Sequence, residues 1–316
     1  MDSLDKKSAF VFTAPLNEKQ LAGKRILITG GASGIGAGCA RLFAAHGSHV
    51  IIADLNEELG RALVAELGGS GGSVNFIRVD VSSFESQKTM FAAALDLLPG
   101  REIDVLIPCA VVGSGFWDYT PLHPDALRTN SALEPTTKTF QVGLVGTYYS
   151  ALICAKYCMG LHVPSSQKES LPYDKSIILV GSLASYGPLP GSPEYTSVKW
   201  GVRGLFRSLR VEMLQTGVRV NMLAPTFIET PLTAAQLPML KKAGVPFAKV
   251  EDVAGVVGRL VVGRGVNGRA LAIMAEQVID LGDDHEGKNA GNILQAMIES
   301  GLLKAPLSFN IPKPHL

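Results

Sequence analysis

Charged residues are scarce in this chain, and neither sign dominates. They make up 18% of the 316 residues, and the formal net charge at pH 7 is +1. Proteins that bind nucleic acid through its phosphates carry a basic surface, so this balance predicts no nucleic-acid partner. Hydrophobic residues make up 47% of the chain. That share excludes a disordered protein and allows a large buried core.

Long apolar runs are also missing. No stretch of about 18 uninterrupted apolar residues occurs, so we expect no membrane-spanning helix. The N-terminal segment carries several charges and lacks the apolar stretch of a secretory signal. We therefore expect a cytoplasmic protein with no membrane partner.

Cysteine is rare, with four residues in the whole chain, of which Cys154 and Cys158 lie four positions apart in an apolar stretch. Two cysteines at this spacing share one face of a helix and can form a metal or redox pair. No histidine or second cysteine pair completes a ligand set. The favoured interpretation is therefore two small buried hydrophobic side chains, and we predict no metal site.

Short apolar segments alternate with segments of helical periodicity along most of the chain. Strands are predicted at residues 24–31, 49–56, 73–81, 103–110, 175–185, 217–225 and 269–276. Helices are predicted at residues 34–47, 57–69, 83–98, 136–160 and 194–215. Strict alternation produces right-handed crossovers and a parallel sheet that helices cover on both faces. We therefore predict one α/β domain of the Rossmann type, a doubly wound sheet of about seven strands with ligands at its carboxyl edge.

The segment "TGGASGIG" follows the first predicted strand and opens the first helix. Gly30, Gly34 and Gly36 form the pattern TGxxxGxG, with Ser33 and Ile35 between them. Glycine permits a sharp turn and close approach of a pyrophosphate, and the helix N-terminus offers free N–H groups. A tight turn without a ligand is the alternative. The strand before and the helix after favour a dinucleotide site.

Acidic residues end the second and third predicted strands. Asp54 can accept hydrogen bonds from adenosine ribose and would repel a 2′-phosphate, and no arginine follows it in "IIADLNEE". This predicts NAD rather than NADP as the cofactor. A helix cap is the alternative role, for which Asn56 is better placed. Asp80 and Val81 are placed to contact adenine, although Asp80 is equally suited to cap the next turn.

Tyr195 and Lys199 lie four positions apart in "GSPEYTSVKWG", so a helix would place them on one face. Tyrosine has a pKa near 10, and a base working near neutrality needs a lower value, which a neighbouring cation supplies. Ser182 lies 13 residues before Tyr195. Taken singly, these residues also suit a half-buried core tyrosine, a solvated helix face and a turn at a strand end.

Together the glycine motif and the late Tyr-x-x-x-Lys resemble the short-chain dehydrogenase/reductase family over residues 22 to 275, and more loosely its hydroxyprostaglandin and fungal secondary-metabolite alcohol dehydrogenases. The resemblance implies that Tyr195 is the catalytic acid/base and that Lys199 binds the nicotinamide ribose and lowers the pKa of the tyrosine. It implies that Ser182 orients the substrate. The segment "APTFIET" would hold the nicotinamide carboxamide through Pro225, Ile228 and Thr230.

Three family signatures are altered in this chain. Residues 108–111 read "PCAV" where the family has Asn-Asn-Ala-Gly, and Thr226 follows Pro225 where glycine is usual. Gly143 stands where the family has the asparagine that supports a water in the proton relay. We expect this relay to be weakened or rerouted, with a carbonyl of a kinked helix as one possible substitute.

The resemblance also implies a domain organisation: an N-terminal extension at 1–21, a catalytic domain at 22–280 with a lid at about 226–250, and a C-terminal extension at 281–316. A helix is predicted at residues 289–306. Family members form dimers or tetramers through the two long helices, so we expect a homodimer or homotetramer.

The predicted pocket is apolar, which suggests a bulky hydrophobic secondary alcohol or ketone as substrate. Its expected lining is Leu232, Leu237, Met239, Leu240, Phe116, Trp117, Tyr119, Tyr186 and Phe227. For the lid leucines and methionine, ordinary helix packing is nearly as suitable an explanation. NAD-dependent hydride transfer is the leading hypothesis. The alternatives are a non-redox cyclase, isomerase or dehydratase, and a scaffold that binds the cofactor without turnover.

Overall fold

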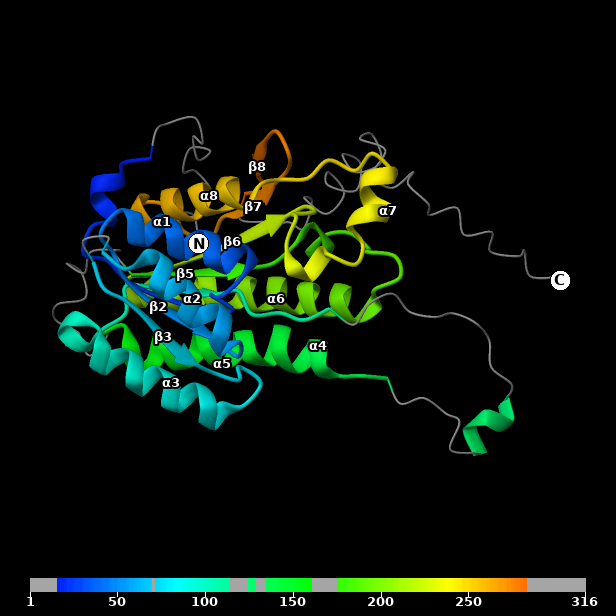
Figure 1. The fold of residues 1–316 in the computed structure, drawn as a ribbon, viewed down its shortest axis with the longest axis horizontal. Helices are drawn as coiled ribbons and strands as arrows, with labels where there is room; N and C mark the ends of the chain where they lie inside the picture. Colours follow the sequence, from blue (N-terminus) through cyan, green and yellow to red (C-terminus); the bar gives the residue numbers. More distant parts are fainter. Residues whose placement is uncertain (1–15, 70–71, 114–123, 129–134, 161–174, 283–316) are drawn as a thin grey trace.

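One sheet of eight strands runs through the centre of the molecule, in the order β3-β2-β1-β4-β5-β6-β7-β8 (Figure 1). This computed structural model describes residues 16–69, 72–113, 124–128, 135–160 and 175–282. The strands are β1 (Arg25–Thr29), β2 (His49–Asp54), β3 (Val74–Arg78), β4 (Val105–Pro108), β5 (Lys175–Val180), β6 (Val218–Pro225), β7 (Ala270–Ile273) and β8 (Val278–Asp280). Neighbouring strands from β3 to β7 are parallel, whereas β8 is antiparallel to β7.

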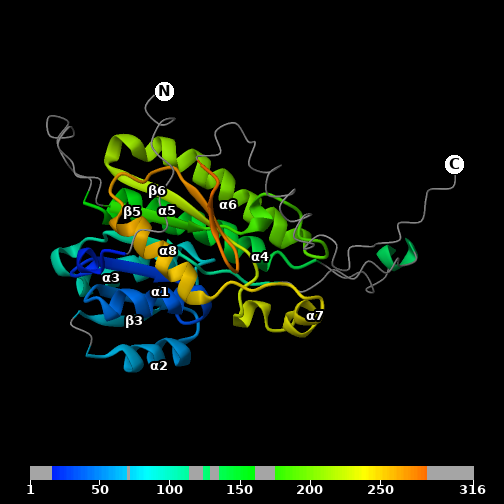
Figure 2. The same cartoon turned by 90° about the horizontal axis from the view of Figure 1, so that it is seen from above.

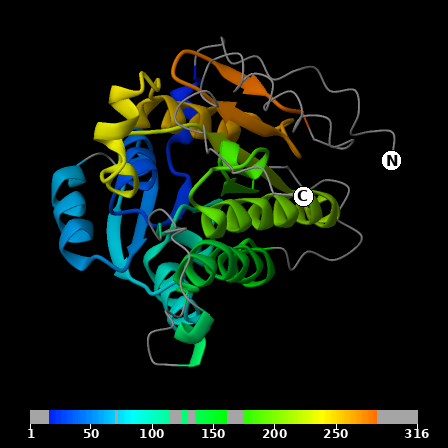
Figure 3. The same ribbon diagram turned by 90° about the vertical axis from the view of Figure 1, so that its right-hand side faces the viewer.

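Helices form a layer on each face of the sheet (Figures 2 and 3). One core contains residues of α1 (Gly34–Ala45), α2 (Glu57–Leu67) and α8 (Val250–Val262), and the other contains residues of α3 (Phe84–Leu97), α5 (Gly146–Ile153) and α6 (Pro193–Glu212). Successive residues of one strand enter opposite cores, as Ile26 and Leu27 of β1 do. The predicted doubly wound α/β fold is therefore confirmed.

All seven predicted strands are present, and β8 is an addition. The sequence prediction missed it because β8 has three residues, all partly exposed, and too short a pattern to recognise. Its carboxylate Asp280 pairs with Arg269 at 2.6 Å, which ties this edge strand to the start of β7.

The predicted helix at 136–160 is observed from residue 138 to 158, but its hydrogen-bond pattern changes along its length. It begins as α4 (Lys138–Phe140), widens to a π-helical turn at Gln141–Val145, continues as α5 and ends in a second π-helical turn at Cys154–Cys158. Such turns insert an extra residue per turn and often mark functional sites. Gly143 lies inside the first one.

Cys154 and Cys158 are buried in the core and make no disulfide. Burial raises the pKa of both thiols, that of Cys158 to about 12. Their predicted role as small buried hydrophobic side chains is confirmed. Part of the predicted N-terminal extension also packs on the core, since Leu21 is fully buried. The predicted helix at 289–306 lies outside the described residues.

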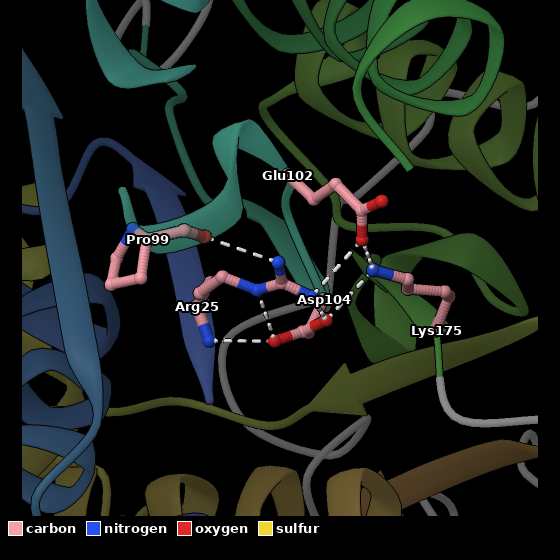
Figure 4. Close-up of polar contacts among 5 residues, drawn as sticks. All are labelled: Arg25, Pro99, Glu102, Asp104 and Lys175. Carbon is pink, nitrogen blue, oxygen red and sulfur yellow. Dashed lines mark hydrogen bonds and ion pairs between the residues drawn. The ribbon is translucent and has the colours of Figure 1, made fainter. Parts of the chain in front are cut away.

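A charged cluster joins three strands at the amino end of the sheet (Figure 4). Asp104, just before β4, accepts hydrogen bonds from Arg25 Nε of β1 and Lys175 Nζ of β5, both at 2.8 Å. Lys175 Nζ also lies 2.8 Å from a carboxylate oxygen of Glu102. Burial acts to raise the pKa of Asp104, but the hydrogen bonds from Arg25 and Lys175 prevail and lower it to about 2. The cluster holds β1, β4 and β5 together at the edge opposite the predicted site.

Candidate active site

A cavity of about 350 Å³ opens at the carboxyl ends of the strands. Every residue predicted to bind the cofactor or to act in catalysis lines it: Gly30, Ser33, Gly34, Ile35, Gly36, Asp54, Asp80, Val81, Ser182, Tyr195, Lys199, Pro225, Ile228 and Thr230. These residues come from segments that follow five strands and are spread over 200 positions of sequence. The sheet topology brings them to one place, as the switch-point rule for such sheets predicts.

The glycine turn is required by close backbone packing. Gly30 has φ +66°, and a Cβ there would lie 2.6 Å from the backbone of Ala110. A Cβ on Gly36 would lie 2.2 Å from the carbonyl oxygen of Gly30. Ser33, at the N-cap of α1, makes no side-chain capping bond. The first-turn N–H groups of α1 are therefore available to an anion.

Asp54 is fixed by two backbone donors. Its Oδ2 accepts from Ala32 N and its Oδ1 from Asn56 N, both at 3.0 Å. Asn56 caps α2 by accepting from Leu59 N at 3.0 Å, so the expectation that Asn56 and not Asp54 is the cap is confirmed. Asp54 lines the cavity, and each of its oxygens retains the capacity to accept a further hydrogen bond.

Asp80 lines the cavity and also makes the local turn that was its alternative role. Its Oδ1 accepts from Ser82 N at 2.9 Å and from Ser82 Oγ at 2.6 Å. These bonds aim the carboxyl group and leave acceptor capacity for a ligand.

Ser182 follows β5 by two residues and begins the 3₁₀ turn Leu183–Ser185, and α6 carries Tyr195 and Lys199 on one face, as the four-residue spacing predicts. Ser182 Oγ accepts from Ala184 N at 3.1 Å, which fixes the hydroxyl at the strand end. Ser182, Tyr195 and Lys199 all line the cavity.

Burial shifts the pKa of both the tyrosine and the lysine. Lys199 Nζ donates to the carbonyl oxygen of Val180 at 2.8 Å and lies 5.5 Å from the centre of the Tyr195 ring. Burial lowers the pKa of Lys199 to about 8. Burial raises the pKa of Tyr195, and the hydrogen bond with Ser182 opposes this without reversing it. The ammonium of Lys199 faces the carbonyl of Val180, and the lowering of the tyrosine pKa by Lys199 stays a prediction.

Gly143 lies against the α6 residue that precedes Lys199. A Cβ at position 143 would come 2.8 Å from Val198 Cγ1 and 3.1 Å from Val111 Cγ2. The carbonyl of Gly143, one backbone carbonyl of this irregular helix, already accepts from Thr147 Oγ1 at 2.8 Å. The space of the missing side chain is thus filled by two valines, and the π-helical turn accommodates them.

The substrate-pocket prediction needs correction. Leu232 lines the cavity, but Leu237, Met239 and Leu240 do not. Met239 is exposed, and Leu240 is buried in packing. Phe227 is not a lining residue either.

Aromatic residues also deviate from that prediction. Tyr186 is buried in the core, 4.3 Å from the guanidinium of Arg203, and does not face the cavity. Phe116, Trp117 and Tyr119 lie outside the described residues. The sequence prediction missed other lining residues, including Cys109, Val112, Lys138 and Val142. These follow β4 or begin the helix after it, where the departure from the family motif removed the usual signal.

Among the described residues, no helix is long and apolar enough to cross a membrane. Within the same residues, no group of three or more histidine, cysteine or acidic side chains is arranged to hold a metal ion.

Comparison with known proteins agrees with this fold. The sequence profile described as short chain dehydrogenase matches residues 24–241. The chain is 37% identical to 5'-hydroxyaverantin dehydrogenase of Dothistroma septosporum, over 88% of this chain and 93% of that protein. It is 34% identical to NADP-dependent dehydrogenase clz5 of Cochliobolus lunatus, over 72% of this chain and 79% of that protein.

The chain belongs to the short-chain dehydrogenase/reductase family, as its motifs predicted. A crystal structure of a 3-ketoacyl-(acyl-carrier-protein) reductase from Brucella melitensis, complexed with NADH, shares the fold with a TM-score of 0.66. That pair is 22% identical and covers 81% of this chain and 98% of the other.

Proposed function

We propose that this protein is an NAD-dependent dehydrogenase/reductase for a bulky hydrophobic secondary alcohol or ketone. The observation that carries the proposal is one cavity that joins the glycine turn to Ser182, Tyr195 and Lys199. An enzyme of this class needs a phosphate site and a proton-transfer group within reach of the same cofactor. Family membership and the similarity to 5'-hydroxyaverantin dehydrogenase support it.

The cavity residues suit a nicotinamide dinucleotide. The free N–H groups at the start of α1 would hold the pyrophosphate, Asp54 the adenosine ribose, and Asp80 with Val81 the adenine. Pro225, Ile228 and Thr230 would hold the carboxamide end. When bound, the nicotinamide ring supplies the hydride acceptor or donor.

The chain's own residues would move the proton. Ser182 would bind the substrate oxygen, and Tyr195 would take the alcohol proton during oxidation or return it during ketone reduction. Lys199, as an ammonium, would stabilise the ionised tyrosine and bind the nicotinamide ribose. Because burial raises the pKa of Tyr195, the neutral phenol is favoured. That state suits reduction, and oxidation should accelerate as pH rises.

The apolar walls of the cavity beside Tyr195 support the proposed substrate class. Val111, Val112, Val142 and Leu232 line the cavity, so we propose a large, weakly charged substrate, as in fungal secondary metabolism. We further propose that the protein forms a homodimer or homotetramer and acts in the cytoplasm.

The test is NADH formation by purified protein with a panel of bulky secondary alcohols, with Tyr195→Phe in parallel. The variant should lose hydride transfer by at least about 10²-fold, the usual contribution of a positioned acid/base, while NAD binding changes little. The oxidation rate of the wild type should rise from pH 7 to about pH 8, above which Lys199 loses the charge that stabilises the ionised tyrosine. Equal turnover by both proteins would exclude Tyr195 as acid/base.

A non-redox role is the second candidate, and the packing around Gly143 favours it. Two valines occupy the space of the relay asparagine, as expected if proton relay were dispensable. Tight NAD binding without NADH formation from any alcohol would support a cyclase, isomerase or dehydratase, or a scaffold without turnover.

A further inference from the structure

The helix α6 directs two buried cations to the chain on either side of Ser182. Lys199 Nζ donates to the carbonyl oxygen of Val180 at 2.8 Å. Arg203 Nη1 donates to the carbonyl oxygen of Ser185 at 3.3 Å. The two cations are four positions apart, so they share one face of the helix. Ser182 therefore lies between two carbonyl groups that one helix holds.

Arg203 is held in place by two aromatic rings as well as by its hydrogen bond. Its guanidinium carbon lies 4.3 Å from the centre of the Tyr186 ring and 5.1 Å from the centre of the Trp200 ring. A guanidinium group is planar, always charged and weakly hydrated, so it packs against aromatic faces better than an ammonium group does. The buried charge therefore has a defined place, although Arg203 does not line the cavity.

Ser185 and Tyr186 belong to the turn that Ser182 begins. Ser182 N donates to Ser185 Oγ at 3.2 Å, and Ser185 N donates to the carbonyl oxygen of Ser182 at 2.9 Å. Tyr186 N donates to the carbonyl oxygen of Leu183 at 2.9 Å. Reciprocal hydrogen bonds of this kind fix the residues of a short turn relative to one another. Contacts that hold Ser185 and Tyr186 therefore also hold Ser182.

We infer that Arg203 is a positioning residue that holds Ser182 at its working distance from Tyr195. The inference rests on the proposed function, which gives Ser182 and Tyr195 their roles at the substrate oxygen. Tyr195 belongs to α6 and Ser182 to the turn, so Arg203 joins the two elements from outside the cavity. Displacement of a reacting group by about 1 Å lowers a rate by up to about 10²-fold. Loss of Arg203 should therefore lower kcat and leave NAD binding unchanged.

Steady-state oxidation of the panel alcohol that the wild type oxidises fastest tests this role. Arg203→Met removes the guanidinium group but keeps an unbranched side chain. We expect it to lower kcat at least about tenfold, while NAD binding measured by calorimetry stays within about twofold. With a substrate deuterated at the carbinol carbon, the isotope effect on kcat should be larger in this variant, because hydride transfer becomes slower relative to product release.

Arg210→Met is the matched control, because Arg210 lies on the same helix and is equally buried. Arg210 also donates to a backbone carbonyl, that of Gly268, at 3.2 Å, and lies 5.4 Å from the centre of the Phe206 ring. Gly268 precedes β7 and does not line the cavity. Arg210→Met should therefore destabilise the protein about as much as Arg203→Met but leave kcat within about twofold.

A double-mutant cycle with Ser182→Ala separates positioning from general stability. If Arg203 acts through Ser182, Arg203→Met should lower the kcat of the Ser182→Ala enzyme by no more than about twofold. Arg203→Lys keeps the buried charge and should recover part of the lost kcat. If Arg203→Met does not fold, Arg203→Lys takes its place in the cycle.

Additive losses of kcat in the cycle would overturn the inference and assign Arg203 to stability alone. An equal loss of kcat in Arg210→Met, or weaker NAD binding in Arg203→Met, would overturn it as well. Wild-type protein that binds NAD but oxidises no alcohol of the panel would instead reject the proposed function, and the role of Arg203 with it.

Discussion

At the scale of single residues, the structure changes the interpretation of Gly143. From the sequence alone, Gly143 replaces the asparagine of the family's catalytic set. In the structure a Cβ at this position would come 2.8 Å from Val198 and 3.1 Å from Val111, so the side chain of Val198 would have to shift. The glycine at position 143 therefore depends on the packing of Val111 and Val198 around it.

Replacing Gly143 with asparagine should destabilise the protein by about 1–3 kcal/mol, the usual cost of overpacking a core site. Gly143→Ala tests the Cβ alone, and since helix propensity favours alanine by about 1 kcal/mol, any net loss there is steric. Urea unfolding measures both, and a double-mutant cycle with Val198→Ala should recover part of the loss. Additive effects in the cycle would show that Val198 does not occupy this space.

At the scale of elements, the strands depend on the charged cluster at their amino ends. Asp104 has a folded-state pKa of about 2, below its ordinary value of 3.8. Its stabilising contribution is therefore present above pH 4 and lost as pH falls toward 2. The difference corresponds to about 2 kcal/mol.

Asp104→Asn should flatten the loss of unfolding free energy between pH 4 and pH 2 and should lower stability at pH 7, where Arg25 and Lys175 lose their partner. Denaturant unfolding at several pH values measures this. Asp96→Asn breaks an exposed ion pair with Arg101 and is the control, with an expected effect below about 1 kcal/mol. Parallel pH profiles for Asp104→Asn and wild type would contradict the assignment.

At the scale of the whole molecule, α5 and α6 present aromatic side chains to solvent. Tyr148 of α5 and Trp200 of α6 are 46% and 45% exposed. Large exposed aromatic residues of this kind mark protein contacts.

We predict a dimer or tetramer in solution, which Tyr148→Glu combined with Trp200→Glu should dissociate by placing charges in the contact. Light scattering after size exclusion measures the mass. Leu127→Glu, at a residue that is 81% exposed outside these helices, is the matched control and should leave the mass unchanged. A monomeric wild type would refute the prediction.

The sequence by itself determined the strand order along the chain, the glycine turn, and the spacing of Tyr195 and Lys199. These depend on local rules of periodicity, backbone freedom and helix geometry, which need no knowledge of distant contacts. Only the tertiary structure decided that Val198 fills the space at Gly143, that Tyr186 is buried beside Arg203, and that Arg203 reaches the carbonyl of Ser185. Each of these is a contact between segments far apart in sequence, set by strand register and helix packing. For the same reason, the burial that raises the pKa of Tyr195 could not be predicted from the sequence, because solvation depends on the whole fold around a side chain.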